Sequence, residues 1–270
     1  MTTGFLHPGA MGASLAAVCA GERVWAGDGR SDATRRRAEA AGIVDVGSLD
    51  ALVGRCDVIV SICPPAAAHE VADAVAAAGF AGIYVDANAV SPATARAVGN
   101  RFARFVDGSV VGPPARAGGG TRLYLAGEDA GVVARLWQGT ALDVVVLDGA
   151  AGAASALKAC YAAWTKGTAA FVLAIRALAR AEGVEHALLD AWSQSNLDLA
   201  HRSEIAAGTA PAAWRFVGEM QEQADAFAAR DLPDGFLRAA ADVYERLRSL
   251  DDASGADLDA VLNALLADPS

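Results

Sequence analysis

Short apolar runs alternate with alanine-rich amphipathic stretches through the first 148 residues of the chain. The runs, such as VIVSI at 58–62 and IYV at 83–85, are rich in β-branched residues and almost wholly apolar. Strands of this kind are buried on both faces, which is typical of a parallel sheet that helices cover on both sides. We therefore expect strands at Thr3–Leu6, Arg23–Ala26, Asp57–Ile62, Gly82–Asp86, Arg104–Asp107, Thr121–Ala126 and Asp143–Leu147. The helices between them are expected at Ala10–Ala20, Asp32–Ala41, Ala66–Ala78, Pro92–Phe102 and Asp129–Gln138.

The pattern changes after Gly149, where the sequence predicts no further strand. We expect an all-helical domain over 149–270, following a first domain over 1–148. The stretch at 151–182 is apolar on nearly every helical face, which is typical of a helix buried in a core or a subunit interface. We favour the interface and therefore expect a homodimer through the C-terminal helices. The predicted helices run over 151–182, 186–207, 212–229, 235–250 and 256–266, and the breaks between them carry Gly or Pro.

A glycine-containing turn follows the first predicted strand and opens the first predicted helix. It reads His7-Pro8-Gly9-Ala10-Met11-Gly12, in which Gly9 and Gly12 match the second and third glycines of the GxGxxG fingerprint. In that fingerprint the backbone turns tightly and approaches the pyrophosphate of a dinucleotide at the helix N-terminus. His7 takes the place of the first glycine, so the match is partial. The position of the turn between strand and helix predicts a Rossmann-type doubly wound parallel sheet that binds a dinucleotide through residues 7–12.

The end of the second predicted strand indicates which dinucleotide to expect. An acidic residue at this point binds the adenosine ribose of NAD, whereas an Arg accommodates the 2′-phosphate of NADP. Asp28 offers the first possibility, and Arg30 with Ser31 offers the second. Arg30 and Ser31 stand just before a predicted helix, where a cation, a hydroxyl and helix N–H groups would surround a phosphate. We therefore favour NADP(H) as the cofactor and keep NAD(H) as the alternative.

Together these segments resemble the β-hydroxyacid dehydrogenases, the family of the 6-phosphogluconate and 3-hydroxyisobutyrate dehydrogenases. That family opens with GFIGLGxMG, to which GFLHPGAMG at 4–12 is similar. Its DAPVSGG substrate loop resembles DGSVVGPP at 107–114, and its GxGxxxK catalytic helix resembles GAASALK at 152–158. More narrowly, HPGAMG, VVGPP and LKACYAAWTKG resemble a subgroup of 6-phosphogluconate dehydrogenase-like proteins whose C-terminal helical domain has no assigned function.

The resemblance implies where the cofactor and the substrate bind. The cofactor would pass Cys63-Pro64-Pro65 at the end of a strand, and Asn88 would contact both the cofactor and the substrate. The substrate would lie against the loop Val111-Gly112-Pro113. Lys158 would be the catalytic residue.

The chain departs from the family pattern at two places in the expected substrate site. The Ser-Gly-Gly of the family's substrate loop becomes Val111-Gly112-Pro113, so a hydroxyl is lost and Pro113 has no N–H to donate. The Asn pair that follows the family's catalytic Lys becomes Tyr161 and Ala162. Tyr161 and Thr165 share the helical face of that Lys, and either would bind the substrate where the family uses Asn. These changes argue against a simple 2-alkyl-3-hydroxy acid as the substrate.

The choice of basic residues also singles out Lys158. Of the 22 basic residues, 20 are Arg, and the remaining two are Lys158 and Lys166. A Lys retained in such a chain suggests a need for an amine that can lose its proton, which Arg effectively cannot do. Reduction of a carbonyl places negative charge on oxygen, and that oxygen needs a proton donor. Lys158 is the expected general acid, and the general base in the reverse direction, with a pKa lowered by its apolar neighbours.

The expected function is an NAD(P)-dependent oxidoreductase that transfers a hydride between a nicotinamide cofactor and a carbonyl or hydroxy-acid small molecule. One alternative is an imine reductase of the same architecture, although members of that group commonly replace the catalytic Lys. The other is a non-catalytic nucleotide-binding protein, because the substrate loop has lost its donors. The roles of Lys166, Arg116, Arg122 and Trp164 stay open.

Charge and composition exclude several other classes. A net charge of −10 at pH 7 argues against a nucleic-acid binder, which normally presents a basic face to phosphates. No apolar run approaches the ~18–20 residues of a membrane-spanning helix, so no membrane partner is expected. The four cysteines lack paired spacing, which indicates reduced thiols in a cytoplasmic protein. The histidines show no metal-ligand spacing, so no metal site is expected.

Overall fold

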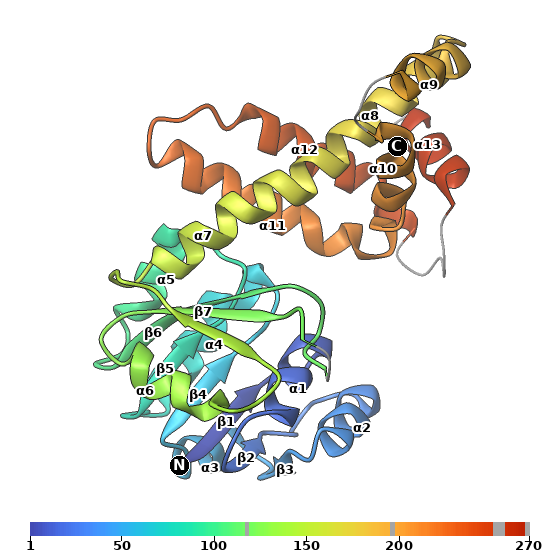
Figure 1. Cartoon of the computed structure of the whole chain (residues 1–270). Helices are drawn as coiled ribbons and strands as arrows, with labels where there is room; N and C mark the ends of the chain where they lie inside the picture. The colour runs from blue at the N-terminus through green and yellow to red at the C-terminus, as the bar shows by residue number, and fades with distance from the viewer. Residues whose placement is uncertain (117–118, 195–197, 251–256, 268–270) are drawn as a thin grey trace. The chain divides into compact units, whose positions relative to one another are not determined.

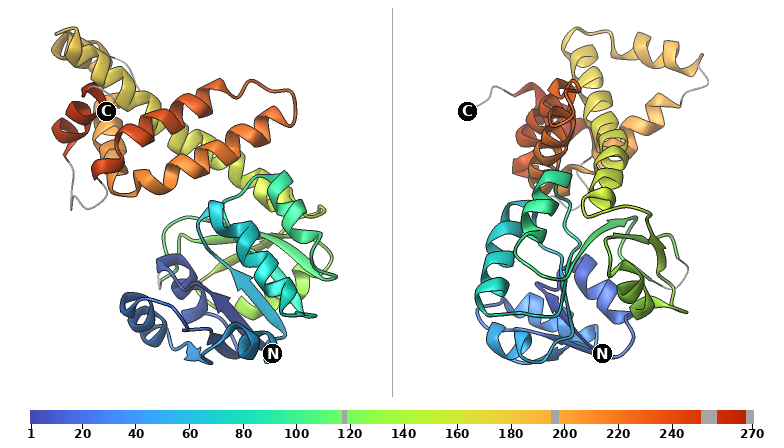
Figure 2. Two further views of the ribbon diagram at one scale, coloured as in Figure 1. Left: turned by 180° about the vertical axis from the view of Figure 1, so that it is seen from behind. Right: turned by 90° about the vertical axis from the view of Figure 1, so that its left-hand side faces the viewer.

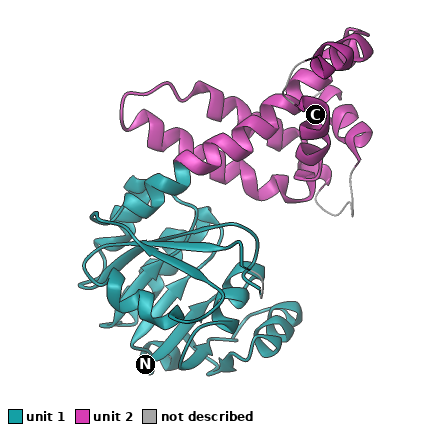
Figure 3. Cartoon of the chain, in the orientation of Figure 1, with its two compact units in different colours: residues 1–159 teal, residues 160–270 magenta. Residues whose placement is uncertain are grey.

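The computed structural model describes residues 1–116, 119–194, 198–250 and 257–267. The chain divides into two compact units, residues 1–159 and 160–270 (Figure 3). The second unit begins inside helix α7 (Ala153–Ala162). The functional boundary that the sequence suggests after residue 148 stays a prediction.

The first unit is built on one eight-stranded sheet. Its strands are β1 (Thr2–Leu6), β2 (Glu22–Trp25), β3 (Val44–Asp45), β4 (Val58–Ser61), β5 (Ile83–Asp86), β6 (Phe105–Val111), β7 (Arg122–Ala126) and β8 (Asp143–Val146). Their order is β3-β2-β1-β4-β5-β6-β7-β8, with all neighbours parallel except β6 and β7. The winding direction reverses between β1 and β4. Doubly wound sheets bind ligands at such a reversal, outside the carboxyl ends of the strands.

Helices pack on both faces of this sheet (Figures 1 and 2). They are α1 (Ala10–Ala17), α2 (Asp32–Ala40), α3 (Leu49–Val53), α4 (Ala68–Ala77), α5 (Pro92–Gly99), α6 (Ala130–Ala134) and the first part of α7, with the 3₁₀ turns η1 (Pro65–Ala67) and η2 (Arg135–Trp137). In β4, Val58 and Val60 join a core cluster with Leu15 of α1, whereas Ile59 joins a separate cluster with Val75 of α4. Side chains that alternate between two cores explain why this strand is apolar in succession. The predicted Rossmann-type fold is confirmed.

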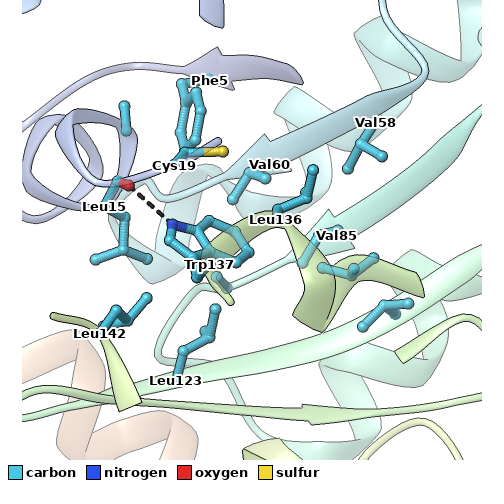
Figure 4. Close-up of a cluster of buried hydrophobic side chains, with 14 of the residues drawn as sticks. Phe5, Leu15, Cys19, Val58, Val60, Val85, Leu123, Leu136, Trp137 and Leu142 are labelled. Carbon is cyan, nitrogen blue, oxygen red and sulfur yellow. Dashed lines mark hydrogen bonds between the residues drawn. The ribbon is translucent and has the colours of Figure 1, made fainter. Parts of the chain in front are cut away.

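Trp137 anchors the core beneath α1 (Figure 4). Its ring is buried, and its indole Nε1 donates a 2.9 Å hydrogen bond to the carbonyl oxygen of Leu15. A buried Trp needs such an acceptor for its N–H. The backbone N–H of Ala20 adds a 2.7 Å bond to the carbonyl oxygen of Leu136. These bonds hold the C-terminal end of α1, the helix that follows the glycine turn, against η2.

The structure contains elements of the first unit that the sequence pattern did not predict. Strand β3 has two residues, both exposed, and therefore lacks an apolar signature. Helix α3 is short, and its N-cap Ser48 accepts a 3.2 Å hydrogen bond from Ala51 N. Strand β6 continues past the predicted end at Asp107 as far as Val111, because residues 107–111 pair with β7.

The described residues of the second unit form helices joined by short connections, and none of them lies in a strand, as predicted. The expected helix at 151–182 is interrupted by a π-helical segment, η3 (Ala163–Gly167), and the expected helix at 186–207 is two helices. The expected start of the last helix at Ala256 lies outside the described residues. The helices are α8 (Thr168–Ala181), α9 (Glu185–Ser193), α10 (Leu199–Ala207), α11 (Ala213–Ala228), α12 (Gly235–Arg246) and α13 (Leu258–Leu266), with the 3₁₀ turns η4 (Ala210–Ala212) and η5 (Arg248–Leu250).

A polar network inside the second unit links three of its helices. The buried guanidinium of Arg176 in α8 donates to Ser203 Oγ of α10 at 2.6 Å and to Glu185 Oε1 of α9 at 3.2 Å. Hydrogen-bonded charges of this kind fix how the helices pack, because breaking one partner leaves the other buried and unpaired. Among the described residues, no helix is long and apolar enough to cross a membrane.

Candidate active site

The glycine turn lies at the carboxyl end of β1, in the middle of the sheet. Gly9 is the N-cap of α1 and offers that helix no side-chain cap. A Cβ on Gly9 would lie 3.9 Å from its nearest neighbour, the carbonyl oxygen of His7, and φ is −68°. Packing inside the protein therefore does not require glycine here. Glycine leaves the space before the helix N–H groups clear, which the predicted close approach of a dinucleotide would need.

His7 adopts the left-handed conformation within this turn. Its φ of +55° is free for glycine but costs a side-chain-bearing residue about 1–2 kcal/mol. Its carbonyl oxygen accepts a 2.6 Å hydrogen bond from Gly9 N, which closes the turn. Burial, and secondly the positive charge of Arg30, lower the pKa of the imidazole to about 4. His7 is therefore neutral near pH 7.

A cavity of about 370 Å³ adjoins the glycine turn. Its volume lies within the range of small-molecule sites, roughly 300–1,000 Å³. The wall combines residues at the carboxyl ends of β1 and β2 with α4, and it brings together His7 and Arg30 from the predicted cofactor set. Asp28 and Glu70 add carboxylates to the same wall. The apolar remainder of the wall consists of Leu6, Ala26, Leu49, Ala67, Val71, Ala74 and Val75.

Asp45 of β3 organises the turn that leads to Arg30. Its Oδ1 accepts hydrogen bonds from Gly27 N at 2.9 Å and Gly47 N at 2.8 Å, and its Oδ2 pairs with Arg35 at 3.2 Å. A Cβ on Gly27 would lie 2.1 Å from this carboxylate, so a larger residue there would force the Asp45 side chain to move. Sequence reasoning missed Asp45, because an acidic residue between an exposed strand and a turn carries no local signal of this role.

Ser31 and Arg37 make contacts at the two ends of α2. Ser31 is the N-cap of α2, and its Oγ accepts a 3.3 Å hydrogen bond from Thr34 N. Arg37 donates a 3.2 Å hydrogen bond to the carbonyl oxygen of Pro8, which ties α2 to the glycine turn. The hydroxyl of Ser31 thus caps a helix, and its predicted contact with the cofactor stays a prediction.

Asn88 is buried between the ends of β4 and β5, with 2% of its surface exposed. Its Oδ1 accepts a 2.6 Å hydrogen bond from Cys63 N, and its Nδ2 donates to Ser61 Oγ at 3.3 Å. The Asn88 amide therefore positions the Cys63-Pro64-Pro65 segment, whose predicted contact with the cofactor stays untested. Burial raises the pKa of the Cys63 thiol to about 11, so it is not a thiolate. Direct contact of Asn88 with the substrate or cofactor also stays a prediction.

The predicted substrate loop leaves β6 after Val111 and folds back on itself. Gly112 has φ +113°, and a Cβ there would lie 2.2 Å from the carbonyl oxygen of Gly120. The carbonyl oxygen of Pro113 accepts a 2.7 Å hydrogen bond from Thr121 Oγ1. Further along, Ala115 N donates to Ser14 Oγ at 2.9 Å. Ser14 lies on α1, so the loop is fastened to the helix that begins at the glycine turn.

Lys158 lies beside the end of β6, where this loop begins. Its Nζ donates a 2.7 Å hydrogen bond to the carbonyl oxygen of Val110. Asp107, buried on the same strand, accepts hydrogen bonds from Gly152 N at 2.8 Å, Ser155 N at 3.1 Å and Ser155 Oγ at 2.6 Å. It therefore caps the start of α7 from another element, where a carboxylate also complements the helix dipole. Burial raises the pKa of Asp107, and the bonds that it accepts oppose that rise.

Other predicted or open residues belong to the second unit. Tyr161 and Trp164 are exposed, and Thr165 Oγ1 donates to the carbonyl oxygen of Tyr161 at 3.1 Å. Lys166 forms an ion pair with the buried Glu219 and lies 4.4 Å from the centre of the Phe216 ring. The predicted substrate contacts of Tyr161 and Thr165 stay predictions, whereas Lys166 is engaged inside the helical unit.

Arg122 and Arg116, whose roles the sequence leaves open, both lie at the surface of the first unit. Arg122 forms an exposed ion pair with Asp143 at 2.9 Å, and Arg116 is exposed in the loop. In the part of the chain that the structure describes, no group of three or more His, Cys, Asp or Glu residues is arranged to hold a metal ion.

The chain is similar to known proteins in both its sequence and its fold. Residues 179–247 match the model of a domain of unknown function, DUF1932. The fold is similar to that of the conserved protein MTH1747 of unknown function, with a TM-score of 0.69 and 27% identity over 94% of this chain and 100% of the other. MTH1747 is itself described as structurally similar to 3-hydroxyacid dehydrogenases. The fold of the chain is β-hydroxyacid dehydrogenase-like, with a C-terminal helical region. The resemblance drawn from its sequence is confirmed.

Two further solved structures share this β-hydroxyacid dehydrogenase-like fold. The 3-hydroxyisobutyrate dehydrogenase of Mycobacterium tuberculosis, solved with L-serine, has a TM-score of 0.69 at 22% identity and covers 98% of this chain and 99% of its own. A reductive aminase from Aspergillus terreus, solved with NADPH4, cyclohexanone and allyl amine, has a TM-score of 0.57 at 14% identity and covers 97% and 98%. A comparison with curated protein sequences gave no match.

Proposed function

We propose that the chain is an NADP(H)-dependent oxidoreductase that interconverts the carbonyl and hydroxyl forms of a small, acidic molecule. The observation that carries this proposal is the cavity beside the glycine turn, to which Arg30 contributes a guanidinium. An Arg at this point of a doubly wound fold accommodates the 2′-phosphate of NADP. Among the solved structures of similar fold, a 3-hydroxyisobutyrate dehydrogenase supports this reaction class, and a reductive aminase solved with NADPH4 supports the cofactor.

The residues present fit a dinucleotide. The clear space before Gly9 would admit the pyrophosphate to the helix N–H groups, and Arg30 would pair with a phosphate in the adjoining cavity. Asp28 and Glu70 line the same cavity and repel phosphate, so Arg30 supplies the positive charge that would attract it. When bound, the nicotinamide supplies or accepts the hydride.

Lys158 would handle the proton in this reaction. Its amine lies at the end of β6, next to the backbone of the predicted substrate loop. There it would donate a proton to the oxygen of a carbonyl substrate, and in the reverse direction it would remove the proton of a hydroxyl. Asp107 would keep α7, and with it Lys158, in register with β6.

A substrate screen tests the reaction class. Purified protein with NADPH should oxidise the cofactor in the presence of at least one small carbonyl-containing acid, and cyclic imines should be poor substrates. Preferred turnover of cyclic imines would instead make the chain an imine reductase. An iminium substrate arrives already protonated and needs no proton from Lys158. Tight NADPH binding without turnover of any carbonyl or imine would indicate a non-catalytic nucleotide-binding protein.

We further propose that the second unit forms a homodimer. Trp164, Phe171 and Phe236 are 66%, 68% and 55% exposed and border a groove of about 580 Å³. Aromatic side chains bury roughly 150–250 Å² each, so these three present about 400 Å² of apolar surface. That is about half of the ~800 Å² that each partner contributes to a standard interface. Small residues line the rest of the groove and leave room for a partner's rings: Ala163, Gly167, Ala170, Ala174, Ala239 and Ala240.

Light scattering tests the dimer. The wild type should give about twice the chain mass of 27.4 kDa at micromolar concentration, and Phe171→Glu should give the single mass, because a charge would be buried in the interface. Leu232→Glu is the matched control, since Leu232 is 52% exposed but does not border the groove. A wild-type mass near 27.4 kDa would contradict the proposal.

A further inference from the structure

His7 stands where the GxGxxG pattern has its first glycine, and the structure places its side chain at the wall of a cavity. The imidazole lines the cavity beside the glycine turn, together with Arg30 and the carboxylates of Asp28 and Glu70. The residue bears the cost of a left-handed backbone that glycine would adopt freely. A strained backbone at a cavity wall is a reason to look for a function of its side chain.

The groups that face His7 come from three elements. Arg30 and Asp28 stand in the segment after β2, Glu70 stands on α4, and Arg37 of α2 contacts the turn through the carbonyl oxygen of Pro8. Burial, and secondly the charge of Arg30, depress the pKa of His7 to about 4. The wall of the free cavity therefore combines one guanidinium, the two carboxylates of Asp28 and Glu70, and an imidazole that is neutral near pH 7.

A bound phosphate would favour the protonated form of the His7 imidazole. A phosphate monoester carries about −1.5 to −2 charges at pH 7, and an opposite charge within ~4–6 Å raises the pKa of a histidine by roughly one to three units. A neutral imidazole that meets a phosphate beside Arg30 thus has a reason to become a cation, which would donate a charge-assisted hydrogen bond.

We propose that His7 is a proton-linked phosphate ligand, whose imidazole takes up a proton from solvent when a phosphate of the dinucleotide enters the cavity beside Arg30. This inference rests on the proposed function, because it needs a bound dinucleotide. The phosphate is either the 2′-phosphate of NADP(H) or the pyrophosphate that NAD(H) also carries. Because the bound form would then carry one proton more than the free form, affinity should rise a few-fold from pH 8 to pH 6.

Isothermal titration calorimetry measures the proton directly. NADP⁺ is titrated into the whole protein at pH 6.5 in two buffers of different ionisation enthalpy, and the difference in heat gives the number of protons taken up. The comparison is with His7→Asn and His7→Gly, both of which tolerate the left-handed backbone but do not titrate. Proton changes of the 2′-phosphate itself occur in all three proteins and cancel in the difference.

The wild type should take up about 0.3–0.5 proton more than either variant with NADP⁺. If the wild type takes up no extra proton with NAD⁺, the 2′-phosphate is the group that protonates His7. If the extra uptake is the same with NAD⁺, the pyrophosphate is that group. Equal uptake by wild type and variants that bind NADP⁺ would overturn the role of His7 and leave the proposed function intact. Binding of neither dinucleotide by any of the three proteins would overturn the proposed function and this inference with it.

Discussion

Replacing Lys158 by Met should reduce kcat by about 10²–10⁴-fold, the usual contribution of a general acid or base. Met fills a similar volume but has no proton to give to the carbonyl oxygen and no donor for the carbonyl oxygen of Val110. The affinity for NADPH should change less than about twofold, because the predicted dinucleotide site is formed by other residues. Steady-state turnover of the best substrate from the screen, with a separate NADPH titration, measures both effects.

Lys158→Arg is the control that separates charge from proton transfer. Arg keeps the positive charge and can donate to Val110, but it effectively cannot lose a proton. Its turnover should therefore be nearly as low as that of Lys158→Met, with wild-type thermal stability. Wild-type kcat in either variant would show that another group handles the proton.

Much of the first unit could be predicted because its strands are buried on both faces. The VIVS and IYVD segments are apolar in succession, since their side chains enter two different cores, and this pattern is visible in one sequence. Strand β3 was missed because its two residues are exposed and contribute nothing to either core. The extension of β6 was missed because its residues 107–109 break the apolar run while their backbone still pairs with β7.

The candidate site was predictable where local motifs carry it and not where distant residues complete it. The glycine turn, Arg30 and Lys158 stand in short, recognisable segments. Asp45 accepts hydrogen bonds from Gly27 N and Gly47 N, and Ser14 Oγ accepts one from Ala115 N, 101 residues away. These contacts exist only in the folded chain. The π-helical segment η3 was also invisible, because Ala163–Gly167 has no residue that marks a change of helical repeat.

Arg30→Ala should weaken NADPH binding by about 10- to 100-fold while leaving NADH binding within about twofold. Hydrogen bonds to charged groups contribute roughly 1.5–3 kcal/mol, and only NADPH carries the phosphate that Arg30 is proposed to bind. Removal of the guanidinium also leaves Asp28 and Glu70 as the charged groups at the cavity wall, which repel that phosphate. Arg36→Ala is the matched control, because Arg36 lies on the adjacent helix α2 but does not line the cavity.

Fluorescence titration of the wild type, Arg30→Ala and Arg36→Ala with NADPH and NADH therefore tests the central claim most directly. We expect the wild type and Arg36→Ala to bind NADPH more tightly than NADH, and Arg30→Ala to lose that preference. Binding of neither cofactor by the wild type, or an unchanged NADPH preference in Arg30→Ala, would contradict the claim that this cavity holds NADP(H).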